Sequence, residues 1–112
     1  MAPPPAAAAP DALDVNAVAH VLTEFCQSDY ARQACQYCNI APSEYGKIQG
    51  MFKSVRLDET RLVVKLHRSF EQRSAQLLDR LAKHLRARMP QLTRLIYEKS
   101  SPPSVSTIIL SS

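Results

Sequence analysis

The spacing of the apolar residues changes along this chain from helical to alternating, then to helical and extended again. Near the start, Val18, Leu22 and Phe25 recur every three or four residues, the period of an α-helix that faces a core. The segment 61–67 instead alternates residue by residue, which is typical of a half-buried strand. A chain that uses both periods predicts helices packed on a sheet, so the expected fold class is α+β.

The first residues do not share this patterning. Met1–Pro10 contains only alanine and proline after the initial methionine, and such a segment cannot pack a core. We therefore expect residues 1–13 to be a disordered tail and residues 14–112 to form a single small domain. Asp14 has the right chemistry to cap the first helix, and a second short helix is expected to begin at Asp29.

The expected order of elements after these helices is ββαββ. Residues 47–57 are rich in strand-forming side chains, and they predict a hairpin with the alternating run 61–67. Ser69 and Gln72 have the spacing of a capping box, which predicts a long helix from Ser69 that ends before Pro90. Two extended runs, 92–98 and 105–110, follow. The prediction is one four-stranded, mostly antiparallel sheet with the helices packed on one face.

No pattern in the sequence predicts a reaction. The three histidines are dispersed, no serine lies in a Gly-x-Ser-x-Gly turn, and the segment Gly46–Gly50 lacks the order of a phosphate-binding loop. Asp58 and Glu59 are adjacent, a spacing that does not pair two carboxylates for acid–base work. We therefore expect neither catalysis nor a small-molecule substrate, and we predict no cofactor.

The three cysteines suggest a metal site only weakly. Cys35 and Cys38 have the Cys-x-x-Cys spacing that lets two thiolates share a zinc ion, and Cys26 lies upstream as a further candidate ligand. A second ligand pair with suitable spacing is absent from the sequence. The alternative interpretation is that the cysteines are small core residues, which is common for free thiols.

Basic residues form the largest group of candidate binding residues. They follow the second expected strand and the long helix, where rigid elements would hold donors for phosphate oxygens. The candidates for nucleic-acid binding are Arg61, Lys65, Arg68, Arg73, Arg80, Lys83 and Arg86. The alternative is an ordinary solvated helix face, because Asp79 is interspersed and few aromatic residues accompany the charges.

The C-terminal run, Val-Ser-Thr-Ile-Ile-Leu, is apolar on both sides and has a high strand propensity. It is compatible with a central strand that is covered on both faces, or with a strand that pairs with another chain. For the second alternative, the interface residues are Val105, Thr107, Ile108, Ile109 and Leu110. The partner would be another protein or a second copy of the chain.

The net charge, the composition and the cysteine count limit the partners and the cellular compartments that we expect. The formal net charge is +4 over 112 residues, which permits a nucleic-acid partner without requiring one. No apolar stretch approaches membrane-spanning length, so we expect no membrane partner. The odd number of cysteines favours a reducing compartment, the cytoplasm or the nucleus. The first hypothesis is a non-catalytic subunit of a larger intracellular complex, followed by a nucleic-acid-binding module and then by a small zinc-stabilised domain.

Overall fold

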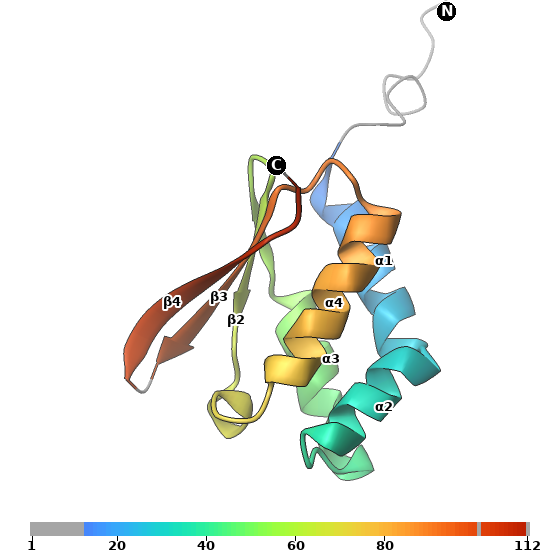
Figure 1. Ribbon diagram of the computed structural model, residues 1–112, viewed down its shortest axis with the longest axis vertical. Helices are drawn as coiled ribbons and strands as arrows, with labels where there is room; N and C mark the ends of the chain where they lie inside the picture. The colour runs from blue at the N-terminus through green and yellow to red at the C-terminus, as the bar shows by residue number, and fades with distance from the viewer. Residues whose placement is uncertain (1–12, 101, 112) are drawn as a thin grey trace, which may run out of the picture.

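The computed structural model describes residues 13–100 and 102–111. Three helices come first: α1 (Val15–Gln27), α2 (Asp29–Tyr37) and α3 (Tyr45–Lys53). A hairpin of β1 (Arg56–Asp58) and β2 (Arg61–Lys65) follows, then α4 (Ala75–Arg88), β3 (Arg94–Ser100) and β4 (Pro103–Ile109). Short 3₁₀ turns at Pro42–Glu44 and Arg68–Phe70 precede α3 and α4 (Figure 1). The α+β class is confirmed.

The four strands form one sheet in the order β1-β2-β3-β4. The two hairpins, β1 with β2 and β3 with β4, are antiparallel, whereas β2 and β3 in the middle of the sheet are parallel. A parallel neighbour requires a crossover, and the segment containing α4 makes it. The sheet is therefore mixed, and β4 is one of its two edge strands.

One face of the sheet contributes to the core. Leu62, Val64 and Leu95 are fully buried there, together with Phe25 of α1 and Leu81 of α4. Asp14 caps α1 as expected, because its carboxylate accepts a hydrogen bond from the Ala17 amide at 2.8 Å. On the opposite face of the sheet the side chains alternate with these and do not belong to the core cluster.

The expected strand at residues 47–57 was wrong over most of its length. Tyr45–Lys53 is the helix α3, and only Arg56–Asp58 is extended. The apolar side chains explain the difference, because Ile48, Phe52 and Val55 recur at helical spacing and all three are buried. In this segment the helical spacing of the apolar residues determines the conformation, although the residue types favour a strand.

The long helix also begins later than expected. Ser69 lies in a 3₁₀ turn, and α4 starts at Ala75 with Ser74 as its N-cap residue. The Ser69–Gln72 capping box is therefore not the start of this helix. The expected tail falls almost entirely on residues 1–12, which lie outside the described residues, while Leu13 packs partly buried against the core.

Candidate functional site

The most distinctive surface of the molecule is the free edge of β4. Among the described strands, β4 pairs only with β3, and it is the outermost strand of the sheet in Figure 1. Val105 and Ile109 are 65% and 58% exposed, the two largest exposures among the valine, leucine and isoleucine side chains of the described residues. An exposed edge strand is a template for pairing with another strand, because its outward N–H and C=O groups have no partner in the sheet.

Hydrogen bonds at the ends of the sheet show which backbone groups of β4 point outward. The Leu110 amide donates to the Thr93 carbonyl at 2.9 Å, so residues 104, 106, 108 and 110 direct their backbone groups toward β3. On the other side of β3, the Glu98 carbonyl accepts from the Leu66 amide, which agrees with this alternation. The outward backbone groups therefore belong to Pro103, Val105, Thr107 and Ile109.

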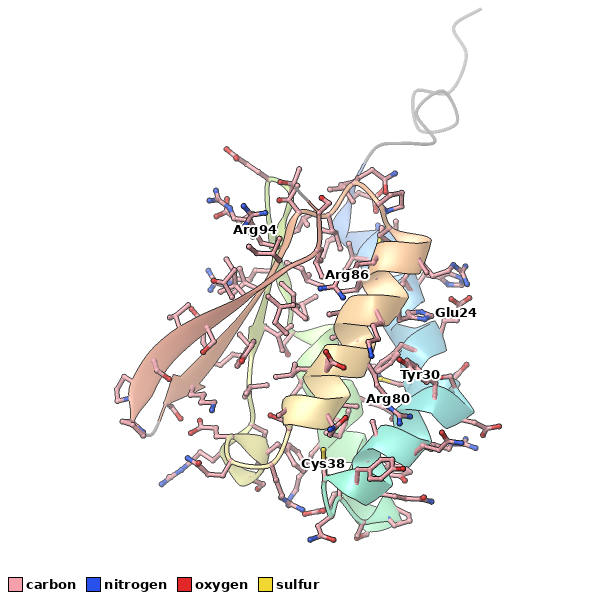
Figure 2. All side chains as sticks on the ribbon, in the orientation of Figure 1. Glu24, Tyr30, Cys38, Arg80, Arg86 and Arg94 are labelled. Carbon is pink, nitrogen blue, oxygen red and sulfur yellow. The ribbon has the colours of Figure 1, made fainter. Side chains whose placement is uncertain are left out.

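One of these outward groups is already bonded. The Arg86 guanidinium donates to the Ile109 carbonyl at 2.7 Å, and Figure 2 shows Arg86 extending from α4 toward the end of β4. This bond confirms that the Ile109 carbonyl points away from β3. Pro103 has no N–H to donate. The free hydrogen-bonding edge is thus bounded by Arg86 at one end and by Pro103 at the other.

The five expected interface residues divide between the two faces of β4. Val105, Thr107 and Ile109 are exposed and lie on the face opposite the core. Ile108 is half-buried against the core and Leu110 is buried, so these two hold the strand in place. The expected alternative of a central strand is wrong, because β4 lies at the edge.

The composition of β4 does not protect its edge. Natural edge strands usually carry a lysine, a glutamate, a bulge or an interior proline that discourages pairing. The seven residues Pro-Ser-Val-Ser-Thr-Ile-Ile include no charge, and their single proline is the first residue. Apart from the Ile109 carbonyl, which Arg86 bonds, the strand after Pro103 is thus open to pairing.

Several of the basic candidates are engaged within the molecule. Arg73 bonds both carboxylate oxygens of Glu44, the closer at 2.7 Å, and also the carbonyls of Asn39 and Ser69. This contact lowers the pKa of the Glu44 carboxyl, chiefly through the hydrogen bonds from Arg73. Arg73 therefore joins the segment between the 3₁₀ turn Arg68–Phe70 and α4 to the 3₁₀ turn before α3, a structural role.

Arg80 likewise serves the packing of two helices. Its guanidinium lies 4.7 Å from the ring centre of Tyr30 and 5.5 Å from that of Tyr37, and it donates to the Tyr30 carbonyl. These contacts join α4 to α2, as Figure 2 shows for Arg80 and Tyr30. Lys83 pairs with Asp79 at 3.3 Å on the exposed side of α4. The basic helix face is thus largely occupied by local partners.

The remaining basic candidates come from β2 and the turn after it. Arg61 pairs with Asp58 and Glu59 around the β1–β2 turn, at 3.4 Å and 3.6 Å. Lys65 and Arg68 are exposed, and their side chains have no hydrogen bond or ion pair with another described residue. Both line a groove of about 600 Å³ between α3 and the end of β2. Its polar and charged lining residues are Lys47, Ser54, Lys65, His67, Arg68 and Ser100.

The three cysteines lie in or beside the core. Cys35 and Cys38 are buried and Cys26 is partly buried. Burial, with Cys35 nearby, raises the pKa of the Cys26 thiol to about 11, and burial also raises the pKa of Cys35. Metal ligation requires thiolates, so this environment disfavours it. Within the described ranges, no three His, Cys, Asp or Glu side chains gather as a metal site.

Sequence reasoning missed two features of this surface. Lys47 lines the groove, but the strand expected at 47–57 did not place it there, because this segment is the helix α3. Glu71, which is buried, accepts from both the amide and the hydroxyl of Ser100 at 2.8 Å. This bond ties the turn before α4 to the end of β3. No sequence signal marked it, because an isolated glutamate is ordinarily a surface residue.

Comparison of this chain with protein-family models, with curated proteins and with solved structures found no match. Among the described residues, no helix combines the length and the apolar character that crossing a membrane requires.

Proposed function

We propose that this protein is a non-catalytic assembly module that joins a partner by strand addition at the edge of β4. The observation that carries the proposal is the combination of an exposed, uncharged edge with outward backbone groups at Val105, Thr107 and Ile109. Strand addition takes its affinity from main-chain hydrogen bonds and its specificity from alternate side chains. In this arrangement the helices cover one face of the sheet, and β4 offers its edge and the other face.

The side chains on the outer face support the same proposal. Val105, Thr107 and Ile109 are β-branched. Thr107 lies opposite Ile96 of β3, which lies opposite Val63 of β2, while Val105 and Ile109 lie opposite Glu98 and Arg94 of β3. A strand added next to β4 would extend this row of β-branched side chains, which pair well across antiparallel strands. The partner strand would therefore present small or β-branched apolar side chains at alternate positions.

The proposal is tested with a probe strand of known sequence. The probe is a fluorescently labelled peptide with the sequence of residues 102–110, and its binding to the dilute full chain is followed by anisotropy. Val105→Pro removes an outward N–H while leaving the bonds to β3, so it should weaken binding of the probe. Val105→Thr keeps the N–H and the branched shape, and it is the matched control.

A peptide that binds the wild-type chain and the Val105→Thr variant, but not Val105→Pro, supports strand addition. Absence of binding, or binding that Val105→Pro leaves unchanged, would contradict it. Circular dichroism of each variant checks that the fold is retained.

The groove beside α3 favours a second candidate function, nucleic-acid binding. Lys65 and Arg68 line it without ion-pair partners among the described residues, and Lys47 adds a third positive charge. Phosphate oxygens are bound by such donors on rigid elements. The candidate predicts binding of generic RNA or DNA that weakens with salt, with a smaller salt slope for Lys65→Glu or Arg68→Glu. Lys83→Glu, whose lysine already pairs with Asp79, is the control.

A further inference from the structure

The outward backbone groups of β4 are complementary to those of a second, antiparallel β4 strand. The strand has seven residues, Pro103–Ile109, and Ser106 lies at its centre. In an antiparallel pair of two such strands that overlap fully, Ser106 lies opposite Ser106, Val105 opposite Thr107, and Pro103 opposite Ile109. Whether this arrangement is favourable depends on the backbone groups that meet along it.

The inner positions of this arrangement satisfy all of their outward groups. Val105 and Thr107 both point their N–H and C=O away from β3. Facing each other, the two residues exchange two hydrogen bonds, which is the closely bonded pair of an antiparallel ladder. The two-fold axis repeats this pair on both sides of Ser106.

The hydrogen-bonding groups of Pro103 and Ile109, at the two ends of β4, are complementary as well. The amide of Ile109 would donate to the carbonyl of Pro103 in the second copy. The reverse bond is not required, because Pro103 has no N–H and the Ile109 carbonyl already accepts from Arg86. The N–H group that Pro103 lacks thus falls opposite the Ile109 carbonyl, which already accepts a hydrogen bond from Arg86.

We infer from this match that the partner of β4 is a second copy of the chain, joined by an antiparallel β4–β4 pair with Ser106 on the two-fold axis. The inference rests on the proposed function, since it identifies the strand that the edge receives. The two sheets then become one continuous sheet, and the exposed Val105 and Ile109 side chains lie alongside Thr107 and Pro103 of the second copy. Isologous contacts of this kind close the assembly as a dimer.

A neighbouring register of the two β4 strands leaves their backbone groups less well paired. With Thr107 on the axis, Val105 would face Ile109, and the Ile109 carbonyl would have to accept from Val105 in addition to Arg86. The Pro103 carbonyl would then lie beyond the strand of the second copy. The Ser106 register avoids both problems.

Disulfide cross-linking distinguishes these possibilities. In the Ser106 register, the two Ser106 residues form a non-hydrogen-bonded pair with Cα atoms about 4.5 Å apart, within the range that a disulfide spans. The two Thr107 residues are then about 8 Å apart, and the two Ser104 residues are farther apart still. Ser106→Cys should therefore form a disulfide-linked dimer with loss of the monomer band on non-reducing gels. Ser104→Cys, the same substitution on the same face, and the wild-type chain should not.

The cross-linking and sedimentation results test the register and the self-association separately. Linkage at position 106, located by mass spectrometry, supports the inference, and linkage of Thr107→Cys in its place would overturn the register. A chain that stays monomeric in sedimentation and does not cross-link at Ser106→Cys would overturn the self-association. If such a monomer still binds the probe peptide of residues 102–110, strand addition stands and only the identity of the partner is wrong.

Discussion

Replacing Ile109 by lysine is expected to weaken association of the chain strongly while leaving its fold intact. The Ile109 side chain is 58% exposed and faces away from the core, so the isolated fold does not need it. Burying a whole isoleucine side chain contributes about 1.5–3 kcal/mol. If pairing covered all of the exposed part, Ile109 would contribute at most about 0.9–1.7 kcal/mol per copy. A two-fold interface contains it twice, which gives at most about 1.7–3.5 kcal/mol.

This free energy corresponds to an increase of roughly 20- to 400-fold in the dissociation constant. Sedimentation velocity over a concentration series measures it, and thermal unfolding checks the fold. The matched control is Val15→Lys on α1, because Val15 is also a largely exposed aliphatic residue, at 48%, and lies on a different element. An unchanged dissociation constant for Ile109→Lys, or an equal change for Val15→Lys, would refute the reasoning.

Three further predictions concern the fold. Leu85→Ala removes a fully buried side chain, so denaturant unfolding should show a loss of about 2–5 kcal/mol; a loss below 1 kcal/mol would contradict the packing. Because Arg73 lowers the pKa of Glu44, the ionised carboxylate stabilises the fold above the ordinary glutamate pKa of 4.5, and this stability is lost as the pH falls through the folded pKa. Wild type should therefore exceed Glu44→Gln in stability at pH 7, with the gap closing in acid; a pH-independent gap would argue against the ion pair. The Cys26 thiol, with its pKa raised to about 11, should react with iodoacetamide at pH 8 more slowly than a cysteine in a short peptide, and an equal rate would contradict its burial.

Periodicity predicted the elements whose apolar pattern is unambiguous. The stripe of Val18, Leu22 and Phe25 marked α1, and the alternation of Leu62 and Val64 marked β2. The segment 47–57 was misassigned because its composition favours strands while its spacing favours a helix. Where the two disagree, the spacing reports burial directly, since it sets which side chains face the core.

The candidate site could be predicted only in part. The apolar C-terminal run was recognised as either a central or a partner-pairing strand, and only the sheet order placed it at the edge. Sequence alone could not reveal that Arg86 bonds the Ile109 carbonyl, because that contact joins residues far apart in the chain. For the same reason the basic residues looked like one surface, although Arg73 and Arg80 are committed to packing contacts.

Amide hydrogen exchange of the wild-type chain at low and high concentration tests the use of the β4 edge most directly. The Val105, Thr107 and Ile109 amides point away from β3, so they should exchange rapidly in dilute solution and become protected as the concentration rises. The Leu110 amide, which already donates to Thr93, should be protected at both concentrations. Rapid exchange of the three outward amides at every concentration, with no protection on adding the probe peptide, would contradict the proposal that this edge binds a partner.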